Sequence, residues 1–233
     1  MTTLGSFKVN SPGIVSVISK NPLKQALFSR NFADVLEIRF DKICESILKS
    51  KKLIQEIKVN TGLPCIVTNR SHEEGGNFEG SEKERVKFLI ELIPFADAVD
   101  IELSTDKVLR NEVIKCAKEN GLSVIISSHD FLNTPDIEIM KAILNKSFKE
   151  GADIAKLAVM PNSIKDVLNL LAVTLDMKEV GSVCTISMGE IGKHSRIIAS
   201  LYGSVLTYGT PDNAVAPGQY NIKELRALHS TIG

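Results

Sequence analysis

The feature that most restricts the fold of this chain is a regular alternation of apolar runs, typical of buried strands, with amphipathic segments typical of helices. Eight strands are predicted, at residues 13–18, 33–40, 63–68, 96–103, 122–127, 152–159, 181–187 and 204–207. A helix is predicted after each strand, at residues 22–30, 42–59, 82–93, 106–119, about 134–149, 162–176, 190–199 and 222–230. Eight βα units in 233 residues predict a (β/α)8 TIM barrel, whose typical length is about 250 residues.

A doubly wound open sheet is the alternative architecture. It would usually have fewer repeats and a glycine-rich phosphate-binding turn after its first strand, and residues 16–22 contain no glycine. No Pro/Ser-rich linker and no block of like charge divides the chain, so we expect a single domain over residues 1–233. Residues 6–9 are expected to form an extra strand or a plug.

Charge and cysteine content exclude several classes of function. The formal net charge is zero and the pI is about 6.9, so no overall field favours nucleic acid or an anionic membrane. No stretch approaches the about eighteen apolar residues of a membrane span, and no basic segment followed by an apolar run opens the sequence. We therefore expect a cytoplasmic protein. Four widely spaced cysteines indicate buried thiols in a reducing compartment, not disulfides or a zinc site: Cys44, Cys65, Cys116 and Cys184.

The predicted strand at residues 152–159 is apolar except for one lysine, Lys156. Side chains alternate along a strand, so Lys156 shares one face with Ile154 and Ala158. A buried ammonium is unfavourable unless it is paired or neutralised, and a neutral amine is a nucleophile. Lys156 is therefore a candidate Schiff-base lysine. The alternative is a lysine at an exposed sheet edge with its charge in water.

Polar side chains recur near the carboxyl ends of the other predicted strands, where the active site of a barrel lies. They include Ser16, Glu37, Arg39, Arg70, Glu74, Asp100, Glu102, His129 and Ser187, with the apolar Met188 beside Ser187, Arg196 in the seventh helix and Gln219 in the loop after the eighth strand. Glu37 and Arg39 could instead form a structural ion pair, and Asp100 and Glu102 are interpreted as structural or supporting residues. His72 is interpreted as a solvated loop residue.

These residue types suit imine chemistry on a keto acid. A lysine imine acidifies the neighbouring C–H, an imidazole such as that of His129 can move the proton, and a carboxylate beside it can fix its tautomer. Three arginines around the predicted pocket favour an anionic substrate. No metal-ligand cluster is seen in the sequence, and we expect neither a metal nor another cofactor.

Taken together, the motifs resemble the type I 3-dehydroquinate dehydratases, from about residue 14 to the last helix. The resemblance is carried by Glu37-Ile-Arg-Phe-Asp41, Thr68-Asn-Arg70 with Glu74-Gly-Gly76, Ser127-Ser-His-Asp-Phe131, Lys156, Ser187-Met-Gly189 with Ser195-Arg196, and Ala216-Pro-Gly-Gln219. Each motif is short, but their order on eight βα units is specific to that family.

The resemblance implies that the chain removes water from 3-dehydroquinate by syn elimination to give 3-dehydroshikimate, the third step of the shikimate pathway. Lys156 would form the imine at C3, His129 would carry the proton from C2 to the departing C1 hydroxyl, and Glu74 would position His129. The substrate would be bound by Ser16, Glu37, Arg39, Arg70, Met188, Arg196, Tyr208, Ala216 and Gln219. The resemblance also implies a homodimer.

Two positions depart from what the resemblance leads us to expect. Val215 stands where a serine often precedes the Ala216 motif, and Tyr208 adds a hydroxyl that needs a partner to an expected aromatic wall. Two other functions remain open at this point. A class I aldolase would share the strand-six lysine without needing the His129 motif, and a non-catalytic metabolite-binding barrel would need no nucleophile.

Overall fold

The computed structural model describes residues 2–43, 45–212 and 216–232. Its strands are β1 (Thr2–Leu4), β2 (Phe7–Val9), β3 (Gly13–Ile18), β4 (Val35–Arg39), β5 (Cys65–Thr68), β6 (Ala98–Glu102), β7 (Ser123–Asp130), β8 (Ile154–Val159), β9 (Ser182–Ser187), β10 (Leu206–Thr210) and β11 (Tyr220–Asn221). Its α-helices are α1 (Pro22–Ser29), α2 (Phe40–Ile43), α3 (Ile47–Thr61), α4 (Glu82–Leu92), α5 (Lys107–Glu119), α6 (Ile137–Lys149), α7 (Ile164–Met177), α8 (Gly189–Gly192), α9 (Ser195–Ile198) and α10 (Ile222–Ile232). Short 3₁₀ turns are η1 (His72–Glu74), η2 (Ile93–Phe95) and η3 (Ala199–Tyr202).

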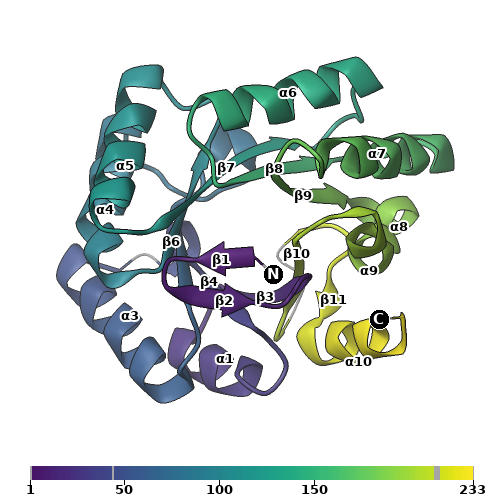
Figure 1. Cartoon of the computed structure of the whole chain (residues 1–233). Coiled ribbons are helices and arrows are strands. Elements are labelled where there is room, and N and C mark those ends of the chain that lie inside the picture. Colours follow the sequence, from purple (N-terminus) through teal and green to yellow (C-terminus); the bar gives the residue numbers. More distant parts are fainter. Residues whose placement is uncertain (1, 44, 213–215, 233) are drawn as a thin grey trace.

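Strands β3 to β10 run parallel and pair in chain order, and the helices surround them (Figure 1). The ring closes between β9 and β10 through a bridge of Val183 with Ser204 and a 2.8 Å hydrogen bond from Val205 N to Val183 O. β11 extends the sheet beside β10. The predicted (β/α)8 barrel is confirmed, and the extent of one domain over residues 1–233 stays a prediction.

The barrel has an apolar layer on each side of its strands. On β8, Ile154 and Ala158 lie in the inner cluster, whereas Ala155, Leu157 and Val159 pack outward against α6 and α7. Lys156 therefore lies on the inner face, as the alternation predicted.

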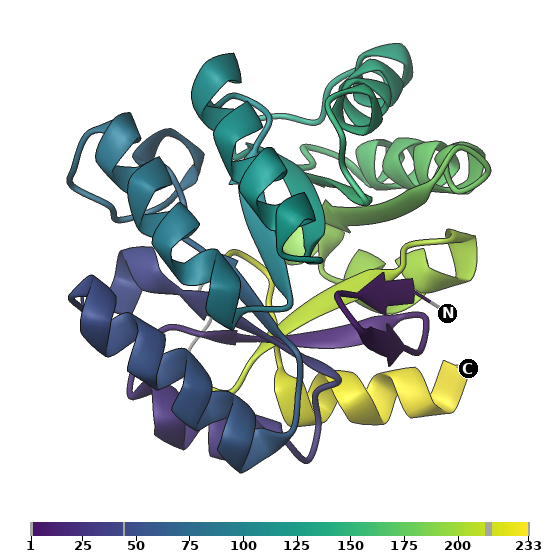
Figure 2. The same ribbon diagram turned by 60° about the vertical axis from the view of Figure 1, so that its left-hand side comes forward.

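The amino-terminal end of the barrel is covered by a hairpin of β1 and β2, with Leu4 and Val9 packed on the inner cluster (Figures 1 and 2). Residues 7–9 of the predicted extra strand do form β2, but β1 was not predicted. Three aspartates (Asp34, Asp97 and Asp153) accept hydrogen bonds from the backbone N–H groups of Ile14, Cys65 and Val124, and so tie neighbouring strands together at this end.

Two predicted helices are interrupted. The helix predicted at residues 42–59 is divided between the end of α2 and most of α3, and α3 begins only after Ser46. The predicted helix at residues 190–199 is divided between α8 and α9, which are separated by Lys193 and His194, and Gly192 packs so closely on the Ser187 backbone that a Cβ there would be 2.5 Å away. The fifth predicted strand, β7, does not end at residue 127 but continues to Asp130. His129 therefore lies on the strand itself.

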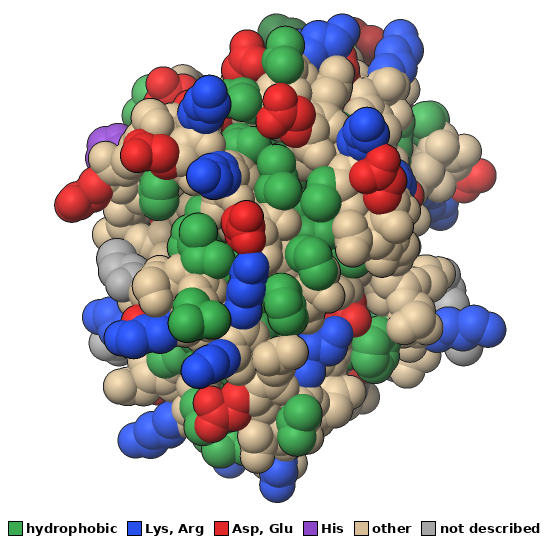
Figure 3. Space-filling model, turned by 90° about the vertical axis from the view of Figure 1, so that its left-hand side faces the viewer, with side chains coloured by type: hydrophobic (Ala, Val, Ile, Leu, Met, Phe, Trp, Pro, Cys, Tyr) green, Lys and Arg blue, Asp and Glu red, His purple; other side chains and the backbone are tan. Residues whose placement is uncertain are grey.

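The face formed by α3, α4 and α5 carries acidic and basic side chains among apolar ones, with both signs spread over it (Figure 3). None of the described helices combines the length and apolar character that crossing a membrane requires. In the described part of the chain, no group of three His, Cys, Asp or Glu side chains could hold a metal ion.

Candidate active site

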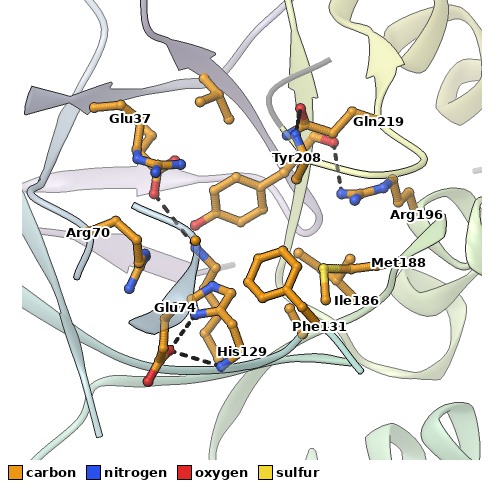
Figure 4. A pocket seen from close by; sticks show the side chains of 16 residues that line it. Glu37, Arg70, Glu74, His129, Phe131, Ile186, Met188, Arg196, Tyr208 and Gln219 are labelled. Carbon is orange, nitrogen blue, oxygen red and sulfur yellow. Dashed lines mark hydrogen bonds and ion pairs between the residues drawn. The ribbon is translucent and has the colours of Figure 1, made fainter. Parts of the chain in front are cut away.

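A pocket opens at the carboxyl ends of the barrel strands (Figure 4). Its lining brings together side chains from β3, β4, β7, β8, β9 and β10 and from the segments that follow β5, β7, β9 and β10. Of the residues predicted from sequence it contains Glu37, Arg39, Arg70, Glu74, His129, Lys156, Met188, Arg196, Tyr208, Ala216 and Gln219.

Ser16 does not reach this pocket, so its predicted placement is wrong. Its hydroxyl is fully buried and makes a 2.7 Å hydrogen bond with Ser29 of α1. The inner face of β3 is formed by Val15 and Val17, and Val17 lines the pocket. Ser16 therefore lies between the barrel and α1.

Lys156 is the centre of the pocket floor and is only 4% exposed. Its Nζ donates a 2.9 Å hydrogen bond to Oδ2 of Asp100 and lies 3.6 Å from Oε1 of Glu37. The ring of Tyr208 faces the same Nζ at 4.1 Å. The lysine is thus paired rather than solvent-exposed, and Asp100 contacts it directly although the sequence suggested only a supporting role.

A buried chain of alternating charges continues from Asp100. Arg70 binds Oδ1 of Asp100 at 2.9 Å and Oε1 of Glu102 at 2.8 Å, and Arg85 binds the other oxygen of Glu102 at 2.7 Å. Burial alone would raise the pKa of Asp100, but the charges of Arg70 and Lys156 outweigh it and hold that pKa well below its usual range. Asp100 is therefore ionised beside Lys156.

Glu37 and Arg39 line the pocket together, but they do not form the ion pair that was one interpretation of the sequence. Arg39 instead forms two 2.8 Å hydrogen bonds with the carboxylate of Asp41. Glu37 accepts a 3.1 Å hydrogen bond from the Thr68 hydroxyl and keeps its carboxylate toward Lys156.

His129 and Glu74 form a pair beside the lysine. Nδ1 of His129 lies 2.7 Å from Oε2 of Glu74, which also accepts a 3.0 Å hydrogen bond from the His129 backbone N–H. Burial, with the charges of Arg70 and Lys156, lowers the pKa of His129 well below its usual value. A neutral imidazole that donates its Nδ1–H to a carboxylate leaves Nε2 as a free base.

The loop that carries Glu74 is fixed by two glycines. Gly75 has a positive φ of 79° and lies against the ring of Phe131, and a Cβ on Gly76 would be 1.9 Å from the carbonyl oxygen of Arg70. The loop therefore packs more closely than any side chain at these positions would allow.

Arg196 lies at the opposite wall of the pocket from Glu74 (Figure 4). Its guanidinium donates to the carbonyl oxygens of Gly218 and Pro217 at 2.9 and 3.0 Å, and no Asp or Glu in the described ranges forms an ion pair with it. Burial lowers the pKa of Arg196 to about 10, so it remains a cation near neutral pH. A buried cation without a carboxylate is suited to receive an anion.

The remaining walls are apolar. Met188, which was predicted, is joined by Phe131 and Ile186, which were not. The Phe131 ring stacks on the His129 ring, with 6.4 Å between the ring centroids and 20° between the ring planes. The motif Ser127–Phe131 could have identified Phe131 from the sequence. Ile186 lies two residues before Met188 and therefore on the same face at the end of β9. This spacing could have identified Ile186 from the sequence.

The comparisons with known proteins agree with this geometry. A family model described as type I 3-dehydroquinase matches residues 19–233. The chain belongs to the type I 3-dehydroquinase family. A 3-dehydroquinate dehydratase of Methanococcoides burtonii is 52% identical, and the match covers 97% of each chain. One from Methanosarcina mazei is 47% identical over 98% of each chain.

Solved structures of this family have the same fold. The type I 3-dehydroquinate dehydratase of Clostridium difficile, in a crystal structure with covalently modified comenic acid, superposes with a TM-score of 0.91 at 30% identity and covers 99% of this chain and 96% of that one. The enzyme of Geobacillus kaustophilus superposes with a TM-score of 0.92 at 27% identity, covering 99% and 95%. The similarity therefore extends over the whole barrel.

We expect His129 to titrate below the usual histidine pKa of about 6.5, because burial and the neighbouring cations disfavour its protonated form. An NMR titration of the four histidines, with His129→Gln to identify the signal, measures this directly. A midpoint at or above about 6.5 would contradict the electrostatic description of the site.

The same shift has a consequence for stability. The unfolded chain takes up this proton near pH 6.5 and the folded chain only at lower pH, so the unfolded state binds more protons in between. The free energy of unfolding should therefore fall as the pH drops from about 6.5 toward the folded pKa. His129→Gln should lose this part of the acid sensitivity, as measured by urea unfolding at several pH values.

Proposed function

We infer that the chain is a type I 3-dehydroquinate dehydratase, a carbon–oxygen lyase that converts 3-dehydroquinate into 3-dehydroshikimate in aromatic amino-acid biosynthesis. The observation that carries this inference is the juxtaposition of a buried lysine with His129 on the neighbouring strand, which is paired with Glu74 of η1. The family match and the names of the relatives support the same activity. An aldolase or a binding-only barrel has no such support.

In the proposed mechanism, the Lys156 ammonium gives up one proton and the neutral amine adds to the C3 ketone. The ketone oxygen then leaves as water, with that proton and a second one from the nitrogen, which gives an iminium ion. The positive charge on this nitrogen is the same as in the resting ammonium, so Asp100 at 2.9 Å stabilises both states. The iminium withdraws electrons from C2 and makes its C–H bond acidic. No metal or other cofactor is needed in this scheme.

His129 would then move the proton. Its register partner on β8 is Ala158, two residues beyond Lys156, and this neighbouring position supports a role for the imidazole at the carbon next to the imine. Nε2 accepts the C2 proton, and the imidazolium returns it to the C1 hydroxyl, which leaves as water while the C1=C2 double bond forms. Glu74 acts as a positioning residue that holds the Nδ1–H tautomer. Hydrolysis of the imine releases the product.

Substrate binding is proposed to divide between the two sides of the pocket. Arg196 and Gln219 would hold the carboxylate, supported by the absence of a carboxylate partner for Arg196 among the described residues. Glu37, Arg39 and Arg70 would hold the hydroxyl groups. Met188, Tyr208 and Ala216 would contact the ring and its edge, and Ser16 is left out because it lies outside the pocket. Val215 lies outside the described residues.

We also propose that the protein works as a cytoplasmic homodimer of single-domain chains, each domain comprising residues 1–233. A row of exposed apolar side chains on α7 offers a surface that a second copy could cover: Ile164, Leu168 and Leu175. Free thiols at Cys65, Cys116 and Cys184 suit a reducing compartment. Sedimentation equilibrium tests the dimer, which should have about twice the 25.5 kDa chain mass.

The activity itself is tested by adding purified protein to 3-dehydroquinate and following the absorbance of the conjugated enone. Parent protein should produce the enone, and Lys156→Ala should not, although it should still give a cooperative thermal melt. Absence of turnover in the folded parent protein would contradict the proposed function. Turnover of an aldol substrate in place of 3-dehydroquinate would favour the aldolase.

Arg196→Ala should lower kcat/KM by about 10²–10³-fold, since loss of one partner of a buried charge pair typically costs about 2–5 kcal/mol. Steady-state kinetics with 3-dehydroquinate measures the effect. Arg226→Ala is a matched control, because Arg226 pairs with Asp34 at the other end of the barrel and should change kcat/KM little. A loss of less than tenfold for Arg196→Ala would mean that another group binds the carboxylate.

A further inference from the structure

The phenol of Tyr208 is a polar group with no hydrogen-bond partner in the described part of the chain. Tyr208 lies on the inner face of β10 and is 3% exposed. Its hydroxyl oxygen is buried, and no described residue forms a hydrogen bond with it. Buried hydroxyl groups in folded proteins are nearly always hydrogen-bonded, so an exception inside a pocket indicates a group kept for a ligand.

The hydroxyl lies at the lysine end of the pocket. The Tyr208 ring faces Nζ of Lys156 at 4.1 Å, and Oε1 of Glu37 is 3.6 Å from the same nitrogen. Figure 4 shows the hydroxyl directed toward Glu37 and Arg70 and away from Arg196 and Gln219. The oxygen of a ketone whose carbon bonds to Nζ can therefore come within reach of this phenol.

The other groups near Nζ are poorly suited to donate a hydrogen bond there. Asp100 is ionised and only accepts, and His129 donates its Nδ1–H to Glu74. Arg70 uses both terminal nitrogens on Asp100, Glu102 and the Ser127 hydroxyl. Burial, followed by the charge of Glu37, raises the pKa of Tyr208 well above its usual value, so the phenol keeps its hydrogen.

We propose that Tyr208 is a further catalytic residue, whose hydroxyl donates a hydrogen bond to the substrate oxygen that leaves while Lys156 forms the imine. This inference rests on the proposed function. In that step the N–C bond forms, the carbonyl π electrons move to oxygen, and the C–O bond then breaks. Two protons of the lysine ammonium end in the departing water and one stays on the iminium, so the phenol donates a hydrogen bond and transfers no proton.

Tyr208→Phe removes the hydroxyl and keeps the ring that faces Lys156. The experiment mixes protein with 3-dehydroquinate, quenches with borohydride at successive times and weighs the protein, which gives the rate of imine formation. We expect this rate to fall by about tenfold or more, as when a donor to a developing oxyanion is removed. Tyr202→Phe, in η3 outside the pocket, is the matched control and should leave the rate unchanged.

Thermal melting of the free protein provides a second readout. Loss of an unpartnered buried hydroxyl should leave the melting temperature of Tyr208→Phe unchanged or raise it by about 2–4 °C, whereas a purely structural phenol would lower it. Slower imine formation with no loss of thermal stability supports the proposal.

A rate of imine formation within threefold of the parent overturns it, whatever the melting temperature. If the parent itself forms no adduct and no product, the proposed function fails instead. The two failures are therefore distinguishable.

Discussion

The ion pair between Lys156 and Asp100 is the interaction on which the rest of the site depends. Both side chains are almost fully buried, and their 2.9 Å contact is made where water cannot screen it. Two charges placed there are unfavourable unless further hydrogen bonds complete them. Arg70 and Ser127 supply those bonds to Asp100. Arg70 is in turn paired with Glu102, which also forms an ion pair with Arg85. Removal of one member would leave its neighbour buried and unpaired, at a typical cost of about 3–5 kcal/mol.

The same charges set the chemistry of the pocket. A resting ammonium and an iminium carry the same charge, so the carboxylate of Asp100 serves the site before and after the covalent bond forms. Burial, together with the charges of Arg70 and Lys156, lowers the pKa of His129 and keeps its imidazole neutral, as a base must be before it takes a proton. One arrangement of charge thus stabilises the cationic nitrogen and keeps the proton carrier in its basic form.

Much of the architecture could be predicted because eight βα repeats allow few folds, and because side-chain alternation placed Lys156, Glu37 and Arg39 on the inner face. Ser16 was misplaced because β3 is buried on both faces, so alternation alone does not say which face points inward. Asp100 was interpreted as a supporting residue because its contact with Lys156 joins residues 56 positions apart. Periodicity did not predict strand β1, the break between α2 and α3, or the break between α8 and α9. These features depend on tertiary packing, which a pattern of apolar residues along the sequence does not contain.

The central claim is that catalysis passes through a covalent imine at one lysine, and its most direct measurement is the site of borohydride modification in the presence of 3-dehydroquinate. The parent protein should gain one substrate- or product-sized mass, and peptide mass spectrometry should place it on Lys156. Modification of another lysine with Lys156 untouched, or an enzyme that turns over without any trappable adduct, would contradict this account.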